Sequence, residues 1–98
     1  MFIKKLSAAG SVIKPPVSKK TKAGLVILKK GEEVGKHITD KREEIIIILQ
    51  GKAKVIIEGE IQLVKKDSLI YIPEGKKHNL INEFEEELKY IYLVFLSS

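Results

Sequence analysis

Two histidines, His37 and His78, are the side chains of this sequence with the clearest capacity for chemistry. Both stand beside turn-forming residues, in the segments 31–39 and 73–82. The chain has no cysteine, which excludes disulfides, zinc ribbons, iron–sulfur clusters and thiol nucleophiles. The sequence also lacks a glycine-rich phosphate loop, a serine nucleophile elbow and a dinucleotide-binding fingerprint. The two imidazoles are therefore the first candidates for chemistry in this sequence.

Short apolar runs separated by turn residues must position the two histidines. No segment has a helical periodicity, and isoleucine, at 15 of 98 residues, favours strands because its branched Cβ packs well on a pleated surface. Glu58-Gly59 is typical of a tight hairpin turn. Many short strands at this spacing predict an all-β sandwich or barrel. The expected strands cover residues 24–30, 34–39, 44–50, 52–58, 60–64, 69–72, 78–82 and 88–96.

The first 23 residues have the weakest pattern of the chain. Pro15–Pro16 prevents a helix there, so we expect an extended N-terminal arm over 1–23 and one β domain over 24–98. The runs Ile45–Leu49 and Tyr90–Leu96 are apolar at successive positions, which predicts that both faces of these strands are covered. The arm or a second subunit would supply the cover, and we expect a homodimer.

The two histidine-containing segments together resemble the two signature motifs of the cupin superfamily. Thr39 stands where the first motif has a second histidine, and Asp67 replaces the glycine that begins the second motif, at a turn where a positive φ is expected. The resemblance covers residues 24–96 and implies a small single-domain cupin. Its fold would be a small antiparallel β-barrel, a double-stranded β-helix of jelly-roll type with one internal pocket. The matching positions are Gly31, His37, Glu44 and Gly51 in the first motif, and Pro73, Gly75, His78 and Asn82 in the second.

The resemblance also implies a metal site, because the family places its ligands at positions 37, 39, 44 and 78. Three of these positions can ligate here, and they are occupied by His37, Glu44 and His78. Two imidazoles and one carboxylate suit a divalent transition metal such as iron, manganese, nickel or zinc, with positions left open for water or substrate. The residues expected to line the pocket are Thr39, which could hydrogen-bond a metal-bound water, Tyr71 and Asn82.

Two functions follow from this resemblance. A metal ion in the pocket could polarise a carbonyl or activate dioxygen on a small molecule, and oxygenases, isomerases and lyases all occur in the family. The alternative is a non-catalytic binding or sensor module that has lost its metal, so whether the chain is an enzyme stays open. Burial of Glu44 without a partner would be costly, which favours a cation beside it, either a metal ion or a protonated histidine.

The net charge of +5 comes almost entirely from lysines that are spread in pairs near turns. This distribution indicates a solvated surface, and we expect no nucleic-acid partner. The apolar runs are too short to cross a bilayer and no signal peptide is evident, so we expect a cytoplasmic protein that does not bind membranes. The abundance of lysine and glutamate is also typical of heat-adapted proteins.

Overall fold

The computed structural model describes residues 1–97, and these residues form nine strands and no helix. No segment among them could therefore cross a membrane as a helix. The observed strands lie close to the expected ones, and the expected hairpin at Glu58-Gly59 is present, with both residues at positive φ. The strands are β1 (Gly10–Ile13), β2 (Thr21–Leu28), β3 (His37–Ile38), β4 (Arg42–Gln50), β5 (Lys52–Ile57), β6 (Glu60–Lys65), β7 (Leu69–Ile72), β8 (Lys77–Ile81) and β9 (Leu88–Leu96).

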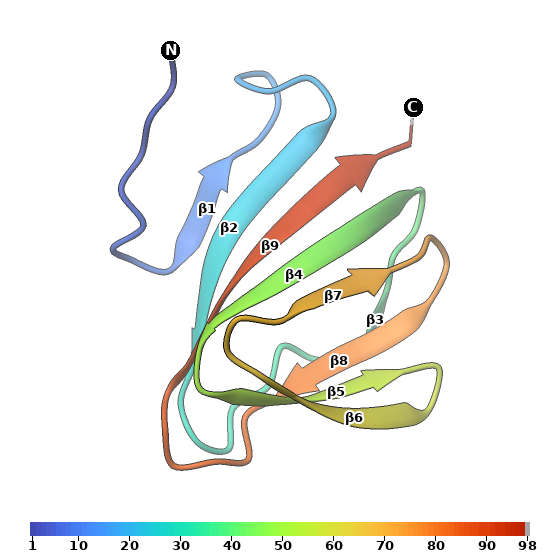
Figure 1. The fold of residues 1–98 in the computed structure, drawn as a ribbon. Helices are drawn as coiled ribbons and strands as arrows, with labels where there is room; N and C mark the ends of the chain where they lie inside the picture. The colour runs from blue at the N-terminus through green and yellow to red at the C-terminus, as the bar shows by residue number, and fades with distance from the viewer. Residues whose placement is uncertain (98) are drawn as a thin grey trace.

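The strands form two antiparallel sheets that face each other. The larger sheet has the order β1-β2-β9-β4-β7, and the smaller sheet has the order β3-β8-β5-β6. Figure 1 shows β4 of the larger sheet leading directly into β5 of the smaller sheet. This arrangement is the double-stranded β-helix, or jelly roll, which confirms the predicted fold class.

The core lies between the two sheets and is built from alternate residues of their strands. Ile46, Ile48 and Ile72 of the larger sheet pack with Val55 and Leu80 of the smaller sheet, and each is at most 3% exposed. Side chains alternate across a strand, so a residue two positions from one of these core residues on the same strand also points inward. Glu44, two residues before Ile46, therefore points into the space between the sheets.

The outer face of β4 is less covered than its inner face. Ile45 and Ile47 are half-buried, and the neighbouring β7 leaves Leu69 and Tyr71 exposed. Within this chain, only the inner face of β4 is fully covered.

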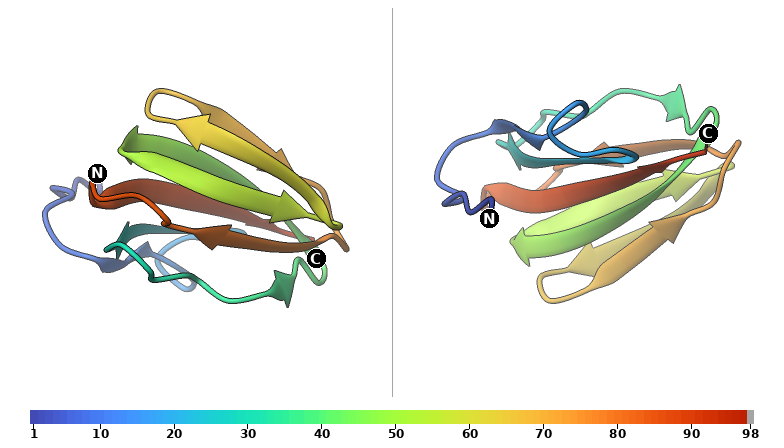
Figure 2. Two further views of the ribbon diagram at one scale, coloured as in Figure 1. Left: turned by 90° about the horizontal axis from the view of Figure 1, so that it is seen from below. Right: turned by 90° about the horizontal axis from the view of Figure 1, so that it is seen from above.

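The segment expected to be an extended arm contributes a strand of its own. Residues 10–13 form β1 and pair with β2, and β2 begins at Thr21, so the boundary expected after residue 23 lies inside β2. Both views in Figure 2 show this N-terminal part at the edge of the larger sheet opposite to β7.

The turn between β6 and β7 carries the aspartate that departs from the cupin motif. Asp67 has a φ of 67°, as expected for a position where the family has glycine. Its backbone N–H donates to the Ile48 carbonyl at 2.8 Å.

Candidate metal centre

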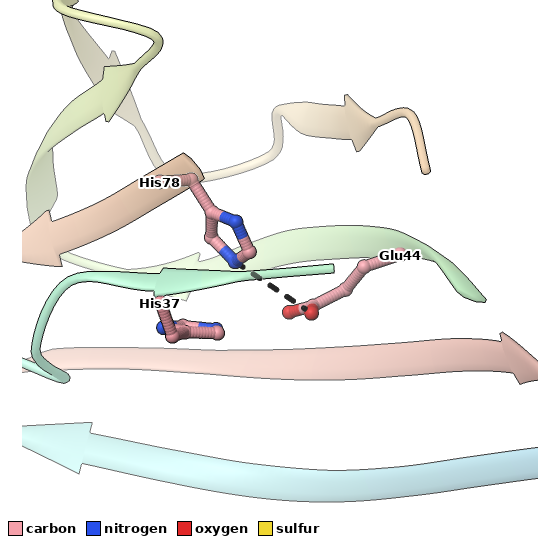
Figure 3. A group of neighbouring side chains, drawn as sticks. All are labelled: His37, Glu44 and His78. Atoms are coloured by element: carbon pink, nitrogen blue, oxygen red, sulfur yellow. Dashed lines mark ion pairs between the residues drawn. The ribbon is translucent and has the colours of Figure 1, made fainter. Parts of the chain in front are cut away.

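Three potential metal ligands converge between the sheets. His37 on β3 and His78 on β8 are direct partners in the smaller sheet, and Glu44 projects toward them from β4 of the larger sheet. One ligand atom from each residue can be chosen so that all three atoms lie within 4.8 Å of one another. Figure 3 shows the two rings and the carboxylate gathered in this space. The structure thus brings together all three ligands that the sequence predicts.

Both imidazoles are oriented by backbone carbonyls. His37 Nδ1 lies 2.8 Å from the Gly35 carbonyl oxygen, and His78 Nδ1 lies 3.1 Å from that of Lys76. A carbonyl can only accept, so each neutral ring carries its proton on Nδ1 and keeps a lone pair on Nε2. Histidine ligands of metals are commonly oriented in this way.

Burial shifts the pKa of two of the three side chains, Glu44 and His78, in the direction that disfavours their charged forms. Burial raises the pKa of Glu44 above its usual 4.5, although His37 and Arg42 oppose this effect. Burial also lowers the pKa of His78 below 6.5, against the hydrogen bond to Lys76. The Nε2 atom of His78 lies 3.8 Å from Glu44 Oε1, too far for a hydrogen bond.

One buried atom shows that these residues fit a metal ion. His78 Nε2 is inaccessible to solvent and has no hydrogen-bond partner among residues 1–97. A buried nitrogen without a partner is costly, and a cation between this atom and the Glu44 carboxylate would satisfy both groups. Two imidazole nitrogens and one carboxylate oxygen are also suitable donors for divalent transition metals.

The three side chains line a cavity of about 320 Å³. A larger cavity of about 620 Å³ is lined by residues of β5, β6 and β7, but neither histidine nor Glu44 lines it. The polar lining of the smaller cavity consists of Lys22, His37, Arg42, Glu44, His78, Tyr90 and Tyr92, and its apolar lining consists of Val26, Val34, Ile46, Leu80 and Val94.

Four polar residues of this lining were missed by the sequence analysis as site residues: Lys22, Arg42, Tyr90 and Tyr92. Strand alternation places Arg42 on the face of Glu44 and the two tyrosines on one face of β9, but it does not say which face of β9 is inward. Burial, aided by the charge of Glu44, raises the pKa of Tyr90, so this hydroxyl stays protonated at neutral pH.

Thr39, expected to line the pocket, is instead fully buried beside the turn that precedes β8. Its hydroxyl donates to the Pro73 carbonyl at 2.7 Å and accepts from the Lys76 N–H at 3.1 Å. The strand β3 ends at Ile38, so the alternation that predicted an inward Thr39 no longer applies. The Lys76 carbonyl in turn orients the His78 ring, so Thr39 positions this candidate ligand indirectly, through the backbone of Lys76.

The structure does not bring Tyr71 or Asn82 to the cavity with the histidines. Tyr71 pairs with Ile45 on the outer face of the larger sheet and donates to Glu43 at 2.9 Å. Asn82 is fully buried, where it donates to the Leu28 and Glu86 carbonyls and accepts from the Phe84 N–H. Asn82 thus satisfies backbone groups.

Known proteins resemble this chain in sequence and in fold. The polyketide synthase CurC of Streptomyces cyaneus is 28% identical over 69 residues, which are 70% of this chain and 45% of that protein, so the chain spans less than half of CurC. The protein TT1209 from Thermus thermophilus has a TM-score of 0.86 at 20% identity, with 98% of each chain covered. The cupin domain of Cnp3 from Schizosaccharomyces pombe has a TM-score of 0.82 at 24% identity, covering 90% of this chain and 63% of that one.

The two structures share the fold of this protein, and their low identity carries no argument beyond the fold. The family model for the cupin domain matches residues 24–95. This range contains β3, β4 and β8, the three strands that carry the candidate ligands. The chain therefore belongs to the cupin domain family.

Proposed function

We propose that this protein binds one divalent transition metal ion through His37, Glu44 and His78 and acts on a small molecule in the adjoining cavity. The observation that carries the proposal is the buried Nε2 of His78, which faces Glu44 and has no hydrogen-bond partner in the described part of the chain. Iron, manganese, nickel and zinc all accept this donor set.

Some residues of the site would bind the metal ion, and others would orient its ligands. The carbonyls of Gly35 and Lys76 hold the imidazoles through Nδ1, which leaves each Nε2 available as a ligand, and Glu44 supplies a negative charge for the cation. The apolar wall, which includes Ile46 and Leu80, limits water around the site. A bound metal ion would act as a Lewis acid that polarises an oxygen atom of the small molecule.

A metal-free binding module is the second candidate. It is favoured by Thr39, whose hydroxyl is engaged by backbone groups and supplies no fourth ligand. In that case the same cavity would bind a small molecule through its polar side chains without a reaction.

Metal analysis separates the two candidates. The purified protein should contain or take up about one transition metal ion per chain, and added metal should raise its melting temperature, since a ligand that binds only the folded state stabilises it. His78→Ala and Glu44→Gln should remove both effects. Glu43→Gln is the matched control, because Glu43 is exposed and bonds Tyr71 on the outer face. A wild-type melting temperature indifferent to iron, manganese, nickel and zinc would overturn the metal proposal.

A further inference from the structure

Two basic side chains reach the same cavity without an acidic partner. Arg42 and Lys22 both line it, and neither forms an ion pair with any residue within 1–97. The Nε of Arg42 is buried and has no hydrogen-bond partner in this part of the chain. A buried guanidinium nitrogen without an acceptor is unfavourable, so an acceptor from a ligand would relieve it.

The strand register places both basic residues on the inner face, next to Glu44. Lys22 is paired with Val94, and Val94 is paired with Glu44, so these three residues form one row across β2, β9 and β4. Arg42 precedes Glu44 by two residues on β4 and therefore points to the same face. The two basic groups thus approach the candidate metal site from neighbouring positions of one sheet.

Basic side chains outnumber carboxylates in the lining of this cavity. Glu44 is the only carboxylate in its lining, whereas Arg42 and Lys22 are both basic. The guanidinium is close enough to lower the pKa of both Glu44 and His78, yet it makes no ion pair with the carboxylate. Its hydrogen-bonding capacity is therefore not used by Glu44.

We propose that Arg42 and Lys22 form a binding subsite for a carboxylate, and that the small molecule is an organic acid. This inference rests on the proposed function for the position of the acid beside a metal ion. A planar carboxylate matches the fork of a guanidinium and would give the buried Nε of Arg42 an acceptor. A cavity of about 320 Å³ corresponds to roughly ten water molecules, which suits a small acid.

Arg42 provides a direct probe, because it is the only arginine in the sequence. In NMR spectra its Nε–Hε signal is therefore assigned without ambiguity. Titration with propionate should shift this signal saturably, whereas propionamide, the uncharged analogue, should not. Lys22→Gln should weaken propionate binding several-fold, and Arg42→Gln, followed through the backbone amides of β4, should weaken it about tenfold or more.

Lys89→Gln is the matched control for Lys22→Gln. Lys89 lies between the buried Leu88 and Tyr90 on β9, so it faces away from the cavity and its loss should leave binding unchanged. A shift that inorganic phosphate or chloride produces equally well would overturn the assignment of a carboxylate subsite.

The same titration in the metal-free and zinc-loaded protein separates the two proposals. Zinc binding without a response of Arg42 to propionate in either form would overturn the carboxylate subsite and leave the proposed metal function intact. A saturable response of Arg42 in a protein that binds no zinc would support the subsite and contradict the metal function.

Discussion

His37 and His78 are direct partners in the β3–β8 pairing, and their rings lie edge to face with centroids 4.0 Å apart. Each ring is held through Nδ1 by the carbonyl two residues before it in the chain. One pairing of two short strands thus sets the positions of two ligands at once. The third ligand, Glu44, comes from the opposite sheet, so the complete site depends on how the two sheets pack.

Glu44→Gln should stabilise the metal-free protein while abolishing metal binding. At a pH above the folded-state pKa of Glu44 the buried carboxylate is ionised at a cost, whereas glutamine of nearly the same shape is neutral. We expect the melting temperature of the metal-free variant to exceed that of the wild type by a few degrees, measured by calorimetry after chelation of metal.

The pH dependence of this difference tests its cause. The folded-state pKa of Glu44 is raised above 4.5, so the folded protein binds the proton more tightly and the wild type loses stability as the pH rises from 4.5 through the folded pKa. The gain in stability of metal-free Glu44→Gln over the metal-free wild type should therefore vanish below pH 4.5 and stay constant once Glu44 is ionised. A wild type more stable than the variant at neutral pH would contradict this account.

Metal affinity should depend on pH in a defined direction. The pKa of His78 is lowered below 6.5 by burial, so its Nε2 is free of protons at neutral pH and competition begins only below 6.5. Calorimetric titration with nickel should give an affinity that is nearly constant above neutrality and falls as the solution is acidified. An affinity independent of pH across this range would indicate a site without histidine.

Thr39→Val should lower both the stability of the folded protein and its affinity for metal. The substitution removes the hydroxyl that bonds the Pro73 carbonyl and the Lys76 N–H, at a cost of about 1–3 kcal/mol. Because the Lys76 carbonyl orients His78, metal affinity should also fall, by about tenfold. Thr39→Ser keeps the hydroxyl and should retain both properties. Unfolding curves and metal titrations of the two variants check this, and equal behaviour of the two would refute the supporting role.

Gly24→Ala should destabilise the fold through Tyr92, its partner across β2 and β9. A Cβ at position 24 would overlap the hydroxyl end of the Tyr92 side chain, so the ring would have to move, at a cost of about 1–3 kcal/mol. In a Tyr92→Ala background the same substitution should cost much less. Chemical denaturation of the four proteins in this cycle measures the coupling, and additive effects would show that the ring does not rest on Gly24.

The sequence was sufficient to predict the fold and the three candidate ligands, because both depend on local signals. Turn residues marked the strands, and the spacing of His37, Glu44 and His78 resembled the cupin motifs. The positive φ at Asp67 was likewise predictable from the residue types at one turn.

The remainder of the cavity depends on which face of each strand points inward, and the sequence did not determine this. Apolar residues occupy both faces of β4 and β9, so alternation could not distinguish the inward Tyr90 and Tyr92 from the outward Tyr71. Arg42 was missed for a similar reason, since a lone arginine at a strand start is typical of a solvated edge. The end of β3 at Ile38 removed Thr39 from the cavity.

The position of a bound metal ion tests the central claim most directly. Crystals grown with manganese or zinc should show one anomalous scattering peak per chain, about 2.0–2.2 Å from Nε2 of His37, Nε2 of His78 and a carboxylate oxygen of Glu44. A peak at any other place, or no peak in crystals soaked with millimolar metal, would contradict the assignment of these three residues as a metal centre.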